Sequence, residues 1–140
     1  LMYETDADRA NEQRLMSAME QAFSFRITSL PAKYNLDAIA WNDGEAKCFF
    51  EFKCRTIASN KYSTAVVNLH KAIAANNLTQ TTGLKCWLVV EWTDMVGVID
   101  FASPFEIGVV GARTDRNDPR DADLFAHYPV EGFRNLNLFN

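Results

Sequence analysis

The stretch Cys48-Phe49-Phe50-Glu51-Phe52-Lys53-Cys54 places two charged side chains inside one of the most apolar segments of the chain. The pattern predicts a β-strand from Ala46 to Cys54. Residues two apart on a strand point to the same face, so Glu51 and Lys53 share a face. Burying charges is costly unless they are paired or hold a metal ion. A further group on that face is therefore needed to compensate them.

Asp37 is the candidate for that group, because it lies on the predicted hairpin partner of this strand. The partner is predicted over Tyr34–Trp41, and Asn42-Asp43-Gly44 is a strong hairpin signal. A two-residue loop would turn Asp37 to the face opposite Glu51. A three-residue loop would place Asp37 opposite Phe49, on the Glu51 face and diagonal to it at about 7–8 Å. We therefore predict the three-residue loop.

The rest of the chain indicates an alternation of helices and strands. Apolar residues at helical spacing predict a first helix over Asp6–Phe23, with Thr5 as its N-cap. A second helix over Lys61–Asn77 is predicted from an apolar stripe of Tyr62, Val66, Leu69 and Ile73. The other predicted strands are Phe25–Leu30, Lys85–Trp92, Met95–Phe101, Phe105–Val110 and an edge strand at His127–Val130.

This order defines the expected fold class. A helix between the third and fourth strands requires a crossover, hence at least one parallel pair of strands. We predict one α/β domain over residues 1–140, with a mixed central β-sheet flanked by helices.

The segment from Gly111 to Asp123 is dense in Arg, Asp, Asn and Pro, which indicates a surface loop. Its arginines (Arg113, Arg116, Arg120) either contact DNA or form ion pairs within the loop.

Composition excludes several classes of protein. The chain has 140 residues and is 48% hydrophobic, and it lacks any run of about 18 apolar residues that could span a membrane. Its acidic start lacks the pattern of a secretory signal. The three cysteines stand singly in apolar runs, which is typical of buried free thiols in a reducing compartment rather than of a zinc site. We therefore expect a cytoplasmic protein.

The charge is negative overall but uneven. The net charge of −4 argues against a protein that coats nucleic acid by charge alone. From Lys47 to Lys71, however, five basic residues stand against Glu51 as the one acid. A local basic surface on an acidic body is therefore compatible with the sequence.

Two converging carboxylates, Asp37 and Glu51, would form the oxygen-rich site that Mg²⁺ prefers. A bound metal can lower the pKa of a water molecule and screen the charge of a phosphate. Lys53 would position or deprotonate that water, or stabilise the pentavalent phosphate. The alternative is a chance spacing, with Glu51 and Lys53 as a simple charge pair. The apolar surroundings and the intervening hairpin favour the functional interpretation.

The order of elements, together with Asp37 and Glu51-Phe52-Lys53, resembles the PD-(D/E)XK nuclease superfamily. Leu36 stands where the family name has proline. The resemblance implies a restriction-endonuclease-like core and a metal-dependent DNA endonuclease, resolvase-like in kind, that uses Mg²⁺ or Mn²⁺. It also implies Asp37, Glu51 and Lys53 as catalytic residues. More specifically, Glu51–Arg55, Trp87–Asp94 and Gly111–Arg116 resemble small phage and bacterial nuclease-like proteins, which implies a bacterial or phage-infected host cell.

Three further residues are candidates for the site. Glu12 lies on the inward face of the first helix, and the resemblance implies that it is a third metal ligand; alternatively, it is a surface acid favoured near a helix N-terminus. The resemblance also implies that Lys71 points toward the site, against a solvated position. Arg55 follows the motif and could bind a phosphate, or be an exposed strand-end residue. His70 is expected to be a surface or packing residue.

Two functions from different classes follow. The first is an endonuclease that binds DNA and forms a homodimer to cut both strands. The alternative is a non-catalytic nuclease-fold module that binds a partner or acts structurally, as a dimer or in a larger complex. The retained Asp37, Glu51 and Lys53 favour the first. An enzyme acting on RNA has no recognition-module signature to support it.

Overall fold

The computed structural model of the chain describes residues 6–109 and 123–139, so the predicted N-cap Thr5 and most of the predicted 111–123 loop lie outside the described residues. Its elements, in chain order, are α1 Asp6–Phe23, β1 Arg26–Ser29, η1 Ala32–Tyr34, β2 Ala38–Asn42, β3 Glu45–Cys54, β4 Thr64–Asn68, α2 Leu69–Thr82, β5 Lys85–Glu91, β6 Val96–Asp100, β7 Glu106–Gly108, β8 Phe125–Pro129, η3 Val130–Gly132 and β9 Arg134–Asn135. None of the described helices is long and apolar enough to cross a membrane.

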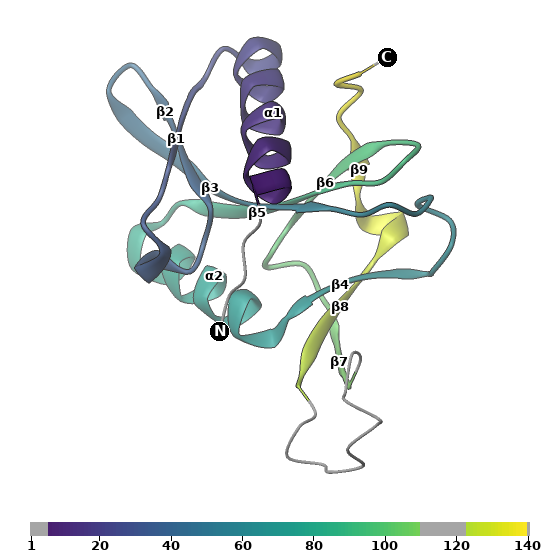
Figure 1. Ribbon diagram of the computed structural model, residues 1–140. Coiled ribbons are helices and arrows are strands. Elements are labelled where there is room, and N and C mark those ends of the chain that lie inside the picture. The colour runs from purple at the N-terminus through teal and green to yellow at the C-terminus, as the bar shows by residue number, and fades with distance from the viewer. Residues whose placement is uncertain (1–5, 110–122, 140) are drawn as a thin grey trace.

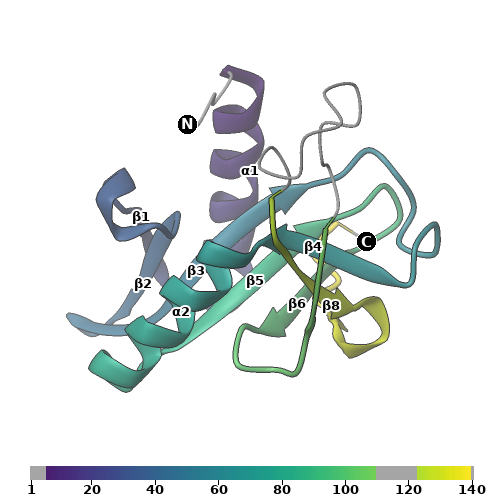
Figure 2. The same ribbon diagram turned by 90° about the horizontal axis from the view of Figure 1, so that it is seen from below.

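The strands form two sheets. The larger has the order β1-β2-β3-β5-β6-β9 and the smaller has the order β4-β8-β7. The predicted parallel pairing is confirmed between β3 and β5, with Glu51 opposite Leu88, whereas the other pairs of the large sheet are antiparallel. α1 lies on one face of the large sheet, and α2 and the small sheet lie on the other (Figure 1, Figure 2).

The two faces of β3 divide the core. Its even-numbered side chains, such as Phe50 and Phe52, pack with the buried residues of α1, which are Leu15, Met16 and Met19. Its odd-numbered side chain Phe49 packs on the opposite side, with Ala72 and Ala75 of α2 and with Leu88 and Tyr128. Glu51 and Lys53 therefore face the α2 side of the sheet. Both lie in the C-terminal half of β3.

The predicted second helix begins in the wrong place. Residues 64–68 form β4, paired with β8, and α2 starts only at Leu69. The side chain of Asn68 accepts a hydrogen bond from the backbone of His70 at 3.1 Å and caps the helix. The apolar stripe was misleading because Tyr62 is 61% exposed and Ile73 is 52% exposed. β-Branched residues in 64–68 favour the strand.

The predicted three-residue hairpin loop is also wrong. Asn42 pairs with Glu45, so the loop has two residues, Asp43 and Gly44. Both have positive φ, 52° and 77°, as the favoured two-residue hairpin turn requires.

A β-bulge in β3 reverses the consequence of this shorter loop. Trp41 lies opposite Ala46 but Ala40 lies opposite Cys48, so Lys47 is the extra residue. The bulge turns the rest of β3 over relative to β2, and the pairing ends with Ala38 opposite Phe50. Asp37 thus lies on the same face as Glu51, as predicted, but the predicted register is wrong, because Ile39 and not Asp37 lies opposite Phe49.

Two other strands, β2 and β8, differ from prediction in where they begin or where they lie in a sheet. β2 begins at Ala38 rather than Tyr34, because Tyr34 ends the short 3₁₀ helix η1 and Asn35 adopts a left-handed conformation with φ 64°. The predicted edge strand near the C-terminus is β8, which lies in the centre of the small sheet between β4 and β7.

Candidate active site

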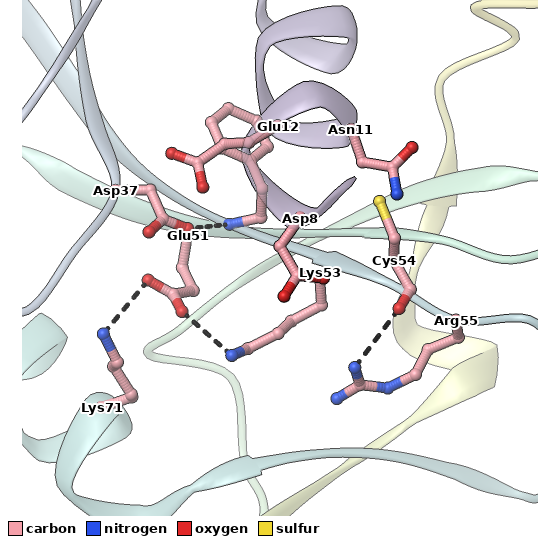
Figure 3. A pocket seen from close by; sticks show the side chains of 10 residues that line it. Asp8, Asn11, Glu12, Asp37, Glu51, Lys53, Cys54, Arg55 and Lys71 are labelled. Atoms are coloured by element: carbon pink, nitrogen blue, oxygen red, sulfur yellow. Dashed lines mark hydrogen bonds and ion pairs between the residues drawn. The ribbon is translucent and has the colours of Figure 1, made fainter. Parts of the chain in front are cut away.

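Asp37 and Glu51 are brought together by the start of β2 and the middle of β3 (Figure 3). The backbone N–H of Asp37 donates to the carbonyl of Phe50 at 3.0 Å. The Oδ2 atom of Asp37 accepts a hydrogen bond from the backbone N–H of Phe52 at 2.7 Å. Asp37 is therefore held by the residues on both sides of Glu51, which fixes the two carboxylates relative to each other.

Glu51 is a buried carboxylate, with 2% of its surface exposed. The Nζ atom of Lys53 lies 3.4 Å from its Oε2, and the Nζ atom of Lys71 lies 3.6 Å from its Oε1. The Oε1 atom has no hydrogen-bond partner among the described residues. Burial raises the pKa of Glu51 to about 7, and the nearby charge of Asp37 adds to this increase, whereas Lys53 and Lys71 oppose it.

Lys71 belongs to this site and not to a solvated helix face. It is the third residue of α2 and only 8% exposed. Its Nζ atom donates a hydrogen bond to the carbonyl of Asn35 at 2.7 Å. The left-handed backbone of Asn35 directs this carbonyl toward α2, so Lys71 links α2 to the turn that carries Asp37. His70 beside it is exposed, as predicted.

Arg55 follows β3 with its guanidinium already oriented. Its Nη2 atom donates to the carbonyl of Val66 at 3.3 Å, and its Nη1 atom lies 3.5 Å from the carbonyl of Cys54. Burial lowers the pKa of this guanidinium, which remains charged because the pKa of arginine lies far above neutrality. A half-buried arginine with N–H groups facing a cavity suits an anionic ligand.

A polar cavity of about 320 Å³ joins these side chains. It is lined by Asp8, Asn11, Glu12, Asp37, Glu51, Phe52, Lys53, Cys54, Arg55 and Lys71. All six residues that the sequence proposed for the site are among them. Asp8, Asn11, Phe52 and Cys54 were not predicted as site residues. Asp8 and Asn11 could have been predicted from their spacing. Asn11 and Glu12 lie three and four positions after Asp8, and residues at such spacings share one face of a helix.

The carboxylates of the site fit the divalent metal ion that the superfamily implies. The described residues contain no group of three or more His, Cys, Asp or Glu side chains placed to hold a metal by themselves. Mg²⁺, however, is usually bound through one or two carboxylates and keeps several water molecules. Two fixed carboxylates fit such an ion, because one of them has a buried oxygen that lacks a hydrogen-bond partner within residues 6–109 and 123–139.

The mixed sheet with its two helices, and the Asp37 and Glu51-x-Lys53 side chains that converge on it, define a protein of the PD-(D/E)XK nuclease class. The chain belongs to the family described as "Phage putative PDDEXK endonuclease", whose sequence model matches residues 1–136.

A solved structure shows the same fold. The chain is similar to Hjc, a Holliday junction resolvase from the archaeal hyperthermophile Archaeoglobus fulgidus, with a TM-score of 0.61 and 10% sequence identity. The similarity covers 91% of this chain and 90% of that chain. At this identity the likeness concerns the fold alone. No curated protein sequence matches the chain.

Proposed function

We propose that the protein is a Mg²⁺-dependent endonuclease that hydrolyses phosphodiester bonds of DNA, with Mn²⁺ able to replace Mg²⁺. The observation that carries this proposal is the state of Glu51. A carboxylate that is 2% exposed, lies beside a second carboxylate and has a buried oxygen without a hydrogen-bond partner in the described part of the chain is costly for the fold. Such a cost is typical of a site whose cation completes it. Membership of a nuclease family supports the same conclusion.

Asp37 and Glu51 would hold the metal ion directly, and Glu12 would reach it through a bound water molecule. Asp37 and Glu51 present carboxylates from the sheet, and Glu12 lines the same cavity from α1. The ion, when bound, supplies Lewis acidity: it favours ionisation of a water molecule and screens the charge of the scissile phosphate.

Lys53 would act on the attacking water or on the phosphate. Its side chain is 31% exposed, so its ammonium group reaches both Glu51 and the open side of the cavity. There it can orient the water whose oxygen attacks phosphorus, or stabilise the negative charge that builds on the phosphate as the ester bond breaks.

Arg55 and Lys71 have supporting roles in this proposal. The guanidinium of Arg55 is pre-oriented by two backbone carbonyls and would bind a phosphate of the DNA strand with little loss of freedom. Lys71 is buried beside Glu51 and offsets the charge of the carboxylate pair, while its hydrogen bond to Asn35 holds the Asp37 turn in place.

The assembly and substrate form part of the proposal. One small domain has one site, so cutting both strands of a duplex requires a homodimer or two successive events. The protein of similar fold is a Holliday junction resolvase, so a four-way junction belongs among the substrates tested. The setting that this proposal implies is the cytoplasm of a bacterium or of a phage-infected cell.

The test is a cleavage assay with matched variants. Purified protein is incubated with supercoiled, linear, single-stranded and four-way DNA, in Mg²⁺, Mn²⁺ or chelator. Glu51→Gln and Lys53→Ala are each expected to reduce cleavage by about 10² or more. Lys85→Ala is the control, because Lys85 lies at the start of β5, does not line the cavity and pairs with Asp100 at 3.5 Å. It should cleave like the wild type.

The same assay contains the result that would refute the enzyme. If the wild type cuts none of these substrates in either metal, and both site variants still bind DNA or a partner as the wild type does, the endonuclease proposal fails. The non-catalytic module that acts as a dimer would then account for the fold, and Glu51 and Lys53 would be structural charges.

A further inference from the structure

An ion pair between Arg14 of α1 and Glu91 at the end of β5 joins residues that are 77 positions apart. The guanidinium meets the carboxylate in a bidentate manner: Nη1 donates to Oε2 at 3.1 Å, and Nη2 contacts Oε1. The side chain of Glu91 is 18% exposed and that of Arg14 is 44% exposed. A two-pronged contact of this kind fixes orientation as well as distance.

The pair lies where the apolar anchoring of α1 ends. The buried residues of α1 are Leu15, Met16 and Met19, and all of them follow Arg14. The α1 residues that line the cavity, which are Asp8, Asn11 and Glu12, all precede it. Arg14 therefore stands between the packed half of the helix and the half that forms one wall of the site. Its Nη2 atom also donates to the Oδ1 atom of Asn11 at 3.4 Å.

Glu91 also contacts the opposite wall of the cavity. Its backbone carbonyl accepts a hydrogen bond from the backbone N–H of Arg55 at 2.7 Å. Its Oε1 atom accepts one from the Sγ atom of Cys54 at 3.6 Å. Arg55 and Cys54 both line the cavity. The helix wall and the β3 wall of the site therefore meet at one residue, Glu91.

We propose that Arg14 and Glu91 form a positioning pair, which holds the first turns of α1, and Glu12 with them, at the correct distance from Asp37 and Glu51. Neither residue of the pair lines the cavity, so their effect on the site would pass through Glu12. This inference rests on the proposed function, in which Glu12 reaches the metal ion through a bound water molecule. The pair would limit rotation of the polar first turns of α1 about the buried Leu15.

The test measures Mn²⁺ affinity by calorimetry in the absence of DNA. Supporting groups of metal ligands typically contribute 10- to 100-fold to affinity, so Arg14→Met is expected to weaken Mn²⁺ binding about tenfold. Arg14→Lys keeps the charge but not the bidentate contact. Its Mn²⁺ affinity should therefore lie between those of the wild type and of Arg14→Met. In a Glu12→Gln background, Arg14→Met should cause no further loss, because the group that it positions is already gone.

Lys85→Met is the control variant. It breaks an ion pair of 3.5 Å between Lys85 and Asp100 at the other end of β5, away from the cavity, and should leave Mn²⁺ affinity unchanged. Thermal unfolding of every variant is recorded alongside. If Arg14→Met and Arg14→Lys lower the melting temperature but bind Mn²⁺ as the wild type does, the pair is merely structural. If the losses from Arg14→Met and Glu12→Gln multiply, the pair does not act through Glu12.

These outcomes separate the inference from the proposed function. Wild-type Mn²⁺ binding that depends on Asp37 and Glu51, but not on Arg14, would overturn the positioning pair and leave the nuclease proposal in place. A wild type that binds no Mn²⁺ would overturn both.

Discussion

Replacing Glu51 with glutamine is expected to stabilise the metal-free protein above neutral pH. Burial raises the pKa of Glu51 from 4.5 to about 7, an increase that already includes the opposing attraction of Lys53 and Lys71. At about 1.4 kcal/mol for each pKa unit, the difference between 4.5 and about 7 corresponds to about 3 kcal/mol. Glutamine has nearly the same shape and carries no charge, so it should avoid this penalty.

The sign of the pH dependence follows from the raised pKa. Between pH 4.5 and about 7, the folded protein keeps the Glu51 proton that the unfolded chain has lost. The free energy of unfolding of the wild type should therefore fall as pH rises through this window, relative to the variant. The two proteins should differ little below pH 4.5. Above about pH 7 the variant should be more stable by up to about 3 kcal/mol, or about 10 °C in melting temperature.

Urea unfolding in chelator, followed across this pH range, measures the effect. Saturating Mg²⁺ should then stabilise the wild type, by about 2.7 kcal/mol at a concentration of 100 times Kd, and should leave the variant unchanged. Glu45→Gln is the control, because Glu45 lies on the same strand but is exposed. A Glu51→Gln protein that is less stable than the wild type above pH 7 in chelator would refute the reasoning. Such a result would show that the attraction between the carboxylate and the two lysines, Lys53 and Lys71, outweighs the cost of burying its charge.

Three further predictions concern single contacts. Arg55→Gln should weaken DNA binding, measured in Ca²⁺ to prevent cleavage, and reduce the slope of log affinity against log salt by about 1; an unchanged slope would exclude a phosphate contact. Asn68→Ala removes the cap that accepts a hydrogen bond from His70 and should cost about 1 kcal/mol in urea unfolding, whereas a helix that began at Lys61 would predict no such loss. Gly97→Ala should lower the free energy of unfolding by about 1–3 kcal/mol, because the added Cβ would lie 2.8 Å from Met95 Cε and 3.1 Å from Phe133 Cβ. A stability equal to that of the wild type would mean that these side chains move aside at no cost.

The sequence predicted the elements whose signals are local and long. α1 has the predicted bounds, and β3, β5 and β6 lie within a residue or two of prediction. These segments combine length with a clear period, so tertiary contacts reinforce the local pattern. The segment before α2 could not be resolved in this way. Its β-branched residues favour a strand, but its apolar residues also fit a helical spacing. The pairing with β8 that decides between the two is made with residues about 60 positions away in the chain.

The site was predicted at the level of chemistry but not of geometry. The six candidate residues could be named because Asp37, Glu51 and Lys53 carry charge into an apolar strand pair, and the other three followed from position and family resemblance. Their partners could not be named. The carbonyl of Asn35 accepts a hydrogen bond from Lys71, 36 positions away, and the carboxylate of Glu91 pairs with Arg14, 77 positions away. Such contacts depend on the packed fold rather than on a pattern.

The β-bulge at Lys47 decides whether a site exists at all. With a two-residue loop and a regular ladder, Asp37 would have faced the α1 side of the sheet, while Glu51 faced α2. The packing of β3 shows the change of face at the bulge. Ala46 packs on the α2 side, whereas Cys48, two residues later, packs on the α1 side. One extra residue, four positions before Glu51, therefore places the two carboxylates together. Hydrophobic periodicity alone cannot reveal it, because a longer loop without a bulge would bring Asp37 to the same face.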